Sequence, residues 1–206
     1  MNPVVEYYSK ILDGSIVTSR KVKAAYTELV ENIYRNEDSE WEYSKERANH
    51  ALDFIENFCK HSKGSMAGKP FILELWQKAF VAAIFGTVDK ITGERKFQEA
   101  ILIVARKNGK STLASAIGLY MMIADGELGP EIYSVATKKD QSKIIWLEAK
   151  RMVKKSKALN KRIKGLVSEM VADMNDAVFK PLGRDSDTLD GLNVHAALFD
   201  KLCPKQ

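Results

Sequence analysis

Cysteine and histidine are scarce in this sequence of 206 residues, and neither forms a recognisable ligand pattern. The two cysteines, Cys59 and Cys203, have neither the spacing of metal ligands nor that of a disulfide framework. The three histidines, His50, His61 and His195, are dispersed and give no zinc-binding pattern. We therefore expect a protein of a reducing, cytoplasmic compartment.

Long hydrophobic runs are also lacking. The longest apolar stretches, AFVAAIFG and IGLYMMIA, fall well short of the roughly 20 residues that span a bilayer. The amino terminus, MNPVVEYYSK, has no basic segment followed by an apolar one, so no secretion signal is visible. Internal repeats and low-complexity tracts are absent as well. These features predict a continuous globular chain without membrane contact.

The composition that remains is that of an ordinary globular protein, with 45% hydrophobic and 29% charged residues. A chain of this length buries roughly 70% of its unfolded surface on folding, which is enough for a substantial core. The net charge of +5 favours polyanionic partners such as nucleic acid only weakly, because many basic proteins bind none.

The first half of the chain reads mainly as helices. Apolar residues at helical spacing predict helices at 20–34, 42–60 and 71–86, and Gly86 is a suitable end for the last of them. Glycine and proline break the pattern at 60–70, which we interpret as a loop. The segment 88–98 has a Thr-Gly turn and is predicted to form a hairpin.

The second half alternates strands with helices. The continuous apolar run Ala100–Val104 is typical of a strand buried on both faces, and an apolar-faced helix follows Lys110. A strand at 131–137 comes next, and Thr137 is suited to cap the helix after it. We expect two further strands around the Asn-Asp turn within 167–182, and a last strand at 196–200. This order predicts an α/β fold with a parallel sheet.

The junction between the run at 100–104 and the next helix resembles a phosphate-binding loop. In the motif G-x-x-x-x-G-K-[ST], backbone N–H groups surround the phosphates and the lysine reaches the terminal ones. Gly109, Lys110 and Ser111 match, but Val104 stands at the first glycine position. A surface turn that happens to begin a helix is the alternative. The flanking strand and helix favour nucleotide binding.

Asp200 fits a Walker B aspartate, which holds magnesium at the carboxyl end of a strand. Taken alone, it is more typical of a turn residue or a helix cap, and only its combination with the loop favours the Walker B interpretation. Such ATPases usually continue with a glutamate that polarises the attacking water, but Lys201 follows here. A cation cannot serve as that base.

Three stretches together resemble the ATPase domain of tailed-phage terminase large subunits, the motors that package DNA into procapsids. They are HSKGSMAGKPFILELWQKAFVAAIFG, RKFQEAILIVARKNGKSTLASAIGLYMMIADGELGPEIYSVATKKDQSKIIW and LDGLNVHAALFD, within about residues 45–200. The family's deviant Walker A loop explains the missing first glycine. The resemblance implies a P-loop NTPase-type parallel sheet flanked by helices, with an N-terminal helical lead-in at 1–66 and an incomplete ATPase core at 67–206. A coupling motif and a nuclease domain would normally follow, so an interrupted gene and a prophage remnant both stay open.

The resemblance also implies roles for single residues. Gln77 matches the glutamine that recognises adenine, although Leu75 stands where a proline is usual, and a solvated helix residue is the alternative. Arg106 matches an arginine that acts as a finger in cis, the alternative being a solvated loop residue. Ser111 and Asp200 would hold Mg²⁺, and Arg106 and Asp200 would be the catalytic pair. The implied nucleotide-binding set is Gln77, Ala105, Arg106, Lys107, Asn108, Gly109, Lys110, Ser111 and Thr112.

The implied ligands are ATP and Mg²⁺, and the implied partners are double-stranded DNA, the terminase small subunit and the portal, in the cytoplasm of a bacterial host. Lys201 predicts weak or absent hydrolysis. A nucleotide-independent basic module that contacts DNA or terminase subunits is the competing hypothesis. The cluster of lysines and arginines at 150–164 would suit DNA, but its interleaved apolar residues equally fit a solvated face of an amphipathic helix.

Overall fold

The computed structural model describes residues 2–136, 139–183 and 192–200, and the chain divides into two compact units. Unit 1 comprises Met1–Asp53 and Ile72–Leu102, and unit 2 comprises Phe54–Phe71 and Ile103–Gln206. The division into 1–66 and 67–206 stays a prediction. Within the described ranges, every helix is too short or too polar to cross a membrane.

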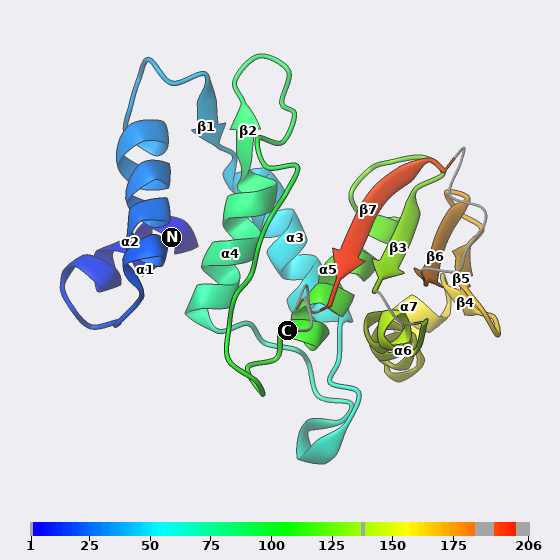
Figure 1. Ribbon diagram of the computed structural model, residues 1–206. Coiled ribbons are helices and arrows are strands. Elements are labelled where there is room, and N and C mark those ends of the chain that lie inside the picture. The colour runs from blue at the N-terminus through cyan, green and yellow to red at the C-terminus, as the bar shows by residue number, and fades with distance from the viewer. Residues whose placement is uncertain (1, 137–138, 184–191, 201–206) are drawn as a thin grey trace. The chain divides into compact units, whose positions relative to one another are not determined.

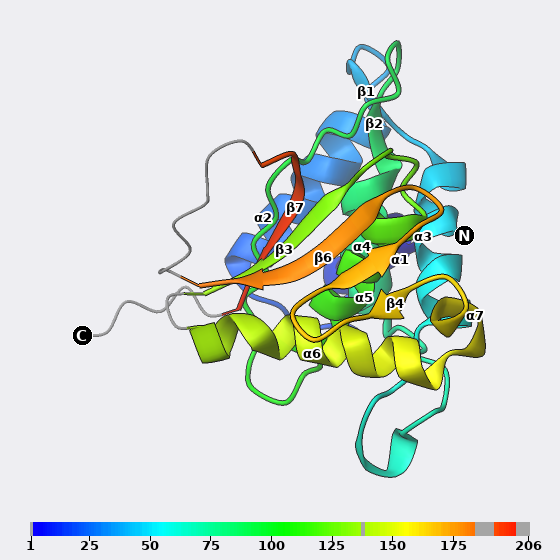
Figure 2. The ribbon, with the colours of Figure 1, turned by 90° about the vertical axis from the view of Figure 1, so that its right-hand side faces the viewer.

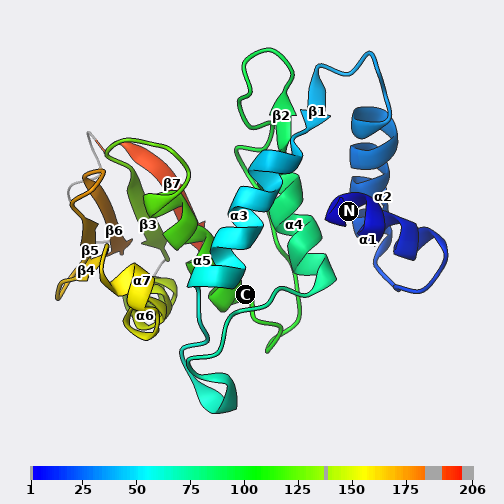
Figure 3. The ribbon, with the colours of Figure 1, turned by 180° about the vertical axis from the view of Figure 1, so that it is seen from behind.

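Unit 1 is mainly helical (Figures 1 and 3). Its elements are α1 (Pro3–Leu12), α2 (Arg20–Thr27), the π-helix η1 (Glu28–Tyr34), β1 (Trp41–Tyr43), the first part of α3 (Lys45–Phe58), α4 (Leu75–Gly86) and β2 (Thr87–Asp89). β1 and β2 pair antiparallel. The helix predicted at 20–34 is confirmed as α2 followed by η1. The helix predicted at 71–86 is confirmed only from Leu75, because Glu74 is its N-cap, and the helix predicted from 42 begins at Lys45 because β1 takes the preceding residues.

Helix α1 is an element that the sequence interpretation missed. Asn2 caps it by accepting a hydrogen bond from the Val4 N–H at 2.9 Å, and Pro3 occupies its first turn, where proline is tolerated. Tyr7 and Ile11 of α1 form a buried cluster with Ala79 of α4. This packing stabilises a helix of ten residues, which would be marginal in isolation.

Unit 2 is built on a five-stranded sheet with the order β4-β5-β6-β3-β7 (Figure 2). The strands are β3 (Glu131–Val135), β4 (Lys164–Gly165), β5 (Met170–Ala172), β6 (Ala177–Leu182) and β7 (Val194–Phe199). The other elements are η2 (Gly64–Met66), α5 (Lys110–Ile123), α6 (Lys139–Lys155) and α7 (Lys157–Asn160). Helices α5 and α6 pack against each other and against the sheet.

The expectation of a parallel sheet is only partly correct. β3 pairs parallel with both β6 and β7, as the alternation of strands and helices predicts. β5 and β6 form the predicted turn-linked pair, with Asp176 at a φ of 54° in the turn, and β4 adds a further antiparallel strand. The sheet is therefore mixed, because a short hairpin can only pair antiparallel. The predicted Thr137 cap lies outside the described residues.

The predicted buried strand at Ala100–Val104 is wrong. No strand is assigned there, and the side chains of Ile101 and Ile103 are 76% and 90% exposed. An apolar run becomes a buried strand only when a neighbouring strand pairs with its backbone. Residues 100–104 have no such partner in the described part of the chain. The apolar composition of residues 100–104 therefore predicts a strand that the structure does not assign.

Two contacts align α5 with β7. Gly118 lies so close to the sheet that a Cβ atom there would come within 2.7 Å of Leu198 Cδ1 and 3.0 Å of the Phe179 ring. His195 Nε2 of β7 lies 2.8 Å from Asp125 Oδ2, just after the end of α5. These contacts fix where the beginning of α5 lies relative to the end of β7.

We expect Gly118→Val to destabilise unit 2 by about 1–3 kcal/mol, the usual cost of overpacking a core. The added atoms would have to displace Leu198 and Phe179. Chemical denaturation measures the change, with Ala114→Val on the same helix as the control for helix propensity. Equal losses in both variants would show that the close approach of Gly118 does not limit packing.

Candidate nucleotide-binding site

The loop before α5 contains two residues in the left-handed region of backbone conformation. Lys107 and Gly109 have positive φ values of 69° and 71°, and α5 begins directly afterwards at Lys110. A positive φ is uncommon for a lysine and is found where a loop is held in a special shape. Asn108 Nδ2 donates to the Ala105 carbonyl oxygen at 3.3 Å and braces the turn. Backbone N–H groups at the beginning of α5 are thus available to an anion.

The side chains of the loop differ in exposure. Ala105, Arg106, Lys107 and Asn108 are exposed, whereas the four residues Gly109–Thr112 are partly buried. Arg106 makes no ion pair with any other residue that the structure describes. Its guanidinium is therefore available to a ligand or to solvent.

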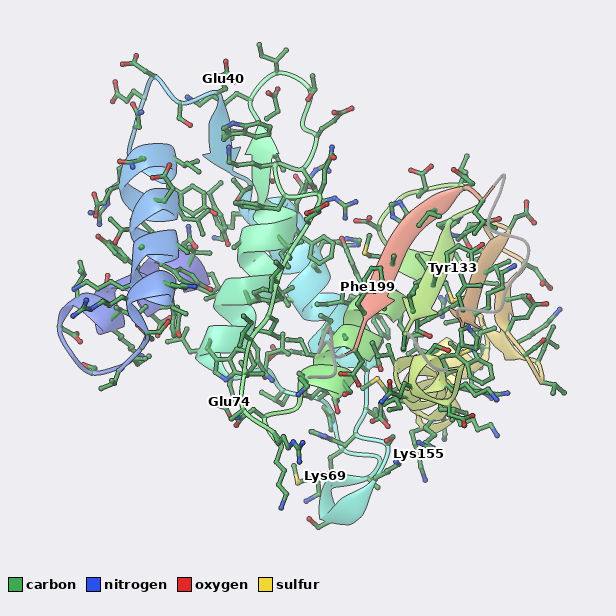
Figure 4. All side chains as sticks on the ribbon, viewed as in Figure 1. Glu40, Lys69, Glu74, Tyr133, Lys155 and Phe199 are labelled. Carbon is green, nitrogen blue, oxygen red and sulfur yellow. The ribbon has the colours of Figure 1, made fainter. Side chains whose placement is uncertain are left out.

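Ser111 and Asp200 come together although 89 positions separate them. Ser111 Oγ donates a hydrogen bond to Asp200 Oδ2 at 3.3 Å. Asp200 follows β7, whose last residue, Phe199, is labelled in Figure 4. A hydroxyl and a carboxylate are both hard oxygen ligands, the type that Mg²⁺ prefers. The arrangement therefore fits the donor set that the sequence predicts for the metal.

A buried serine holds α5 against α6 close to this point. Ser115 Oγ lies 2.7 Å from the Ser111 carbonyl oxygen and 2.9 Å from the Ile145 carbonyl oxygen of α6. The residue is fully buried, so the contact is shielded from water. Ser111 is thus placed beside α6 as well as beside β7.

Gln77 is not the solvated helix residue that the alternative interpretation expected. It is 4% exposed, and its Oε1 accepts a hydrogen bond from the Glu74 N–H at 2.9 Å. The Glu74 side chain completes a capping box at the beginning of α4, where Figure 4 labels it. Gln77 belongs to unit 1 and the loop to unit 2, and its role toward adenine stays a prediction.

A pocket of about 380 Å³, which the sequence does not predict, adjoins the first turn of α5 in unit 2. Its lining residues are His61, Ser62, Lys63, Ser111, Thr112, Ile144, Leu147, Glu148 and Arg151. The four α6 residues are three or four positions apart and therefore lie on one face of the helix. This spacing is the sign of a shared surface that the sequence contains. The pattern at 60–70 predicts a loop and gives no sign of a pocket.

The basic cluster at 150–164 forms the exposed side of α6, α7 and β4. Its apolar residues Met152, Val153, Leu159 and Ile163 are buried, which confirms the amphipathic interpretation. Its exposed cations are Arg151, Lys154, Lys155, Lys157, Lys161, Arg162 and Lys164, of which Figure 4 labels Lys155. Contact with DNA stays a prediction.

The fold and the site together define an α/β protein in which a Gly-Lys-Ser loop begins a sheet-packed helix opposite an aspartate that follows a strand. Residues 75–204 match the family model described as "Terminase large subunit, ATPase domain". The chain belongs to this family. Membership of an ATPase-domain family implies nucleotide binding.

Two comparisons with bacteriophage HK97 agree with this assignment. The chain is 28% identical over 162 residues to the terminase large subunit of Enterobacteria phage HK97, a match that covers 75% of the chain. It is also similar to the crystal structure of the HK97 large terminase, with a TM-score of 0.64, 28% identity and 75% of the chain covered. The chain spans about 30% of the length of these relatives, 30% in the sequence comparison and 31% in the structural one.

Proposed function

We propose that this chain binds ATP with Mg²⁺ through residues 105–112 and Asp200, as the nucleotide-binding part of a phage DNA-packaging motor. The hydrogen bond between Ser111 and Asp200 carries the proposal. It joins the residue after the phosphate-loop lysine to an aspartate that follows a sheet strand. A surface turn that merely begins a helix has no reason to lie opposite such a carboxylate.

Each residue of the loop has a specific task in this proposal. Backbone N–H groups of the turn and the ammonium of Lys110 neutralise the phosphates, with Lys110 reaching the β and γ groups. Ser111 and Asp200 are the residues that would hold the metal. Bound Mg²⁺ would neutralise charge on the terminal phosphates. Because Mg²⁺ keeps several waters and phosphate oxygens as ligands, two protein side chains are sufficient.

We further propose that hydrolysis is impaired. Arg106 is exposed in the loop and is suited to neutralise charge on the transferred phosphoryl group. Lys201 stands where the family has its glutamate, so no carboxylate is available at that position to polarise the attacking water. We therefore expect the chain to bind ATP but to hydrolyse it slowly or not at all.

The proposed partners are double-stranded DNA, the terminase small subunit and the portal. They follow from the family and from the basic surface of α6, α7 and β4. Within the described part of the chain, Lys154, Lys155 and Lys157 form no ion pair, so this charge is available to a polyanion.

We expect Asp200→Asn to remove most of the gain in ATP affinity that Mg²⁺ provides. The change keeps the size of the side chain but removes the charge that holds the metal's water shell, at a cost of about tenfold or more in affinity. Calorimetric titration of ATP with and without Mg²⁺ measures the effect. Asp176→Asn is the matched control, because asparagine tolerates the left-handed turn conformation. An equal Mg²⁺ effect in both variants would contradict the assignment of Asp200.

A further inference from the structure

The pocket beside α5 is built by three separate segments of unit 2. Residues 61–63 come from the segment between α3 and η2, Ser111 and Thr112 from the first turn of α5, and the other four lining residues from one face of α6. Ser111 and Thr112 directly follow Lys110, the lysine of the phosphate loop. The side chains of residues 61–63 therefore share a cavity with the beginning of the helix that would receive the phosphates.

The segment that follows α3 is held in a defined shape by its own backbone. The Phe71 N–H donates a hydrogen bond to the Cys59 carbonyl oxygen at 3.0 Å, and the His61 N–H donates to the Lys69 carbonyl oxygen at 3.0 Å. Cys59 is fully buried, so the base of the segment is anchored in the core of unit 2. The wall of the pocket that this segment forms is therefore fixed in place.

A hydrogen bond between side chains ties this wall to α6. Ser62 Oγ donates to Glu148 Oε1 at 2.6 Å. The Glu148 side chain is 14% exposed, so the hydrogen bond is largely shielded from water and is stronger than one at the surface. Arg151 Nη1 lies 3.9 Å from Glu148 Oε2 and offsets part of the negative charge. Glu148 thus serves as the acceptor that positions Ser62.

Lys63 is the cation beside this hydrogen bond. It follows Ser62 directly in the chain, it lines the same pocket as Ser111 and Thr112, and its side chain is exposed. It forms no ion pair with any other residue that the structure describes. A lysine has an ammonium with three donors on a flexible stem of four carbons, which suits it to reach a nearby anion.

A second lysine of the same segment shows what is particular about Lys63. Lys69, labelled in Figure 4, is also exposed, but it does not line the pocket. Such a cation is typical of a solvated surface. Lys63 differs because a shielded hydrogen bond holds its neighbour against α6, and because the pocket it lines begins at the phosphate loop.

We propose that Lys63 is a second phosphate-binding cation of the nucleotide site, positioned by the hydrogen bond between Ser62 and Glu148. The inference rests on the proposed function, because it needs the triphosphate to lie in the loop. In this arrangement the ammonium of Lys63 donates to phosphate oxygens from a segment outside the loop. Ser62 and Glu148 do not touch the ligand, and they act through Lys63 as positioning residues.

The first test compares Mg-ATP with inorganic tripolyphosphate and Mg²⁺, because tripolyphosphate has the phosphates but no nucleoside. We expect Lys63→Met to weaken both ligands by about tenfold, the usual effect of losing a hydrogen bond to a charged group. Lys63→Arg keeps the charge and is expected to keep most of the affinity. Lys69→Met is the matched control and should leave both affinities unchanged. Calorimetric titration measures all four proteins, including the unaltered one.

The second test asks whether Ser62 acts through Lys63. We expect Ser62→Ala to weaken both ligands less than Lys63→Met does, because the lysine stays but loses its fixed position. In the Lys63→Met background, Ser62→Ala should cause no further loss. A general structural role of Ser62 would instead add its full loss to that of Lys63→Met, since independent effects are additive.

The remaining outcomes separate this inference from the proposed function. Unchanged affinities in Lys63→Met, or a loss confined to ATP, would show that Lys63 does not bind phosphate. An equal loss in Lys69→Met would show only a general attraction between a basic surface and an anion, and the inference would be wrong. If the folded, unaltered protein binds neither ligand, the proposed function fails, and the inference fails with it.

Discussion

Replacing Lys110 by alanine is expected to abolish the stabilisation of this protein by Mg-ATP. Lys110 is the first residue of α5 and supplies the side-chain cation that reaches the terminal phosphates. A ligand at 100 times its dissociation constant stabilises the folded state by about 2.7 kcal/mol. For a chain of this length, that corresponds to a rise in Tm of about 5 to 10 °C. Thermal unfolding with and without Mg-ATP measures the shift in the unaltered protein and in Lys110→Ala.

The control for this experiment is Lys154→Ala, an exposed lysine of α6 outside the loop, which should keep the full shift. The Tm without ligand should also be unchanged in Lys110→Ala, because the side chain is only partly buried. A shift that persists in Lys110→Ala would mean that nucleotide binds elsewhere. No shift in a cooperatively folded, unaltered protein would favour the nucleotide-independent module.

Replacing Lys201 by glutamate is expected to raise the rate of ATP hydrolysis about 10² to 10⁴-fold, the usual contribution of a general base. The residue follows Asp200 directly, and Asp200 already contacts Ser111. A carboxylate at position 201 would supply the group that polarises the attacking water. Phosphate release at saturating Mg-ATP measures the change.

Lys201→Gln separates the two effects that this change combines. Glutamine removes the positive charge without supplying a base, so we expect its rate to stay close to that of the unaltered protein. An equal gain in rate for the glutamate and glutamine variants would show that the charge of Lys201, and not a missing base, limits hydrolysis. If neither variant gains activity while ATP still binds, the proposal that Lys201 causes the impairment is wrong.

Much of the candidate site could be predicted from residues close together in the chain. Gly109, Lys110 and Ser111 are consecutive, and the turn and helix they form depend on local backbone preferences, so their conformation follows the motif. A second local pattern, an apolar strand that ends in a carboxylate, predicts the position of Asp200. Ser111 Oγ and Asp200 Oδ2 lie 3.3 Å apart. This contact depends on the parallel pairing of β3 with β7, which positions the end of β7.

Other features could not be read from local patterns. The run Ala100–Val104 has the composition of a buried strand but lacks a neighbouring strand that pairs with it in the described residues. Helix α1 has a clear cap at Asn2, yet its burial depends on α4. The family resemblance points to Gln77 through a single position, and only the structure places its amide oxygen in the cap of α4.

The sequence by itself determined the phosphate-loop motif, the alternation of helix and strand through α5, β3 and α6, and the family. Each of these is encoded by neighbouring residues and by the periods of helices and strands. The tertiary structure alone decided that the sheet is mixed, that Ser111 faces Asp200, and that Ser62 and Glu148 connect two walls of a pocket. These features depend on contacts between residues far apart in the chain, and a single sequence contains no signal of which distant residues will pair.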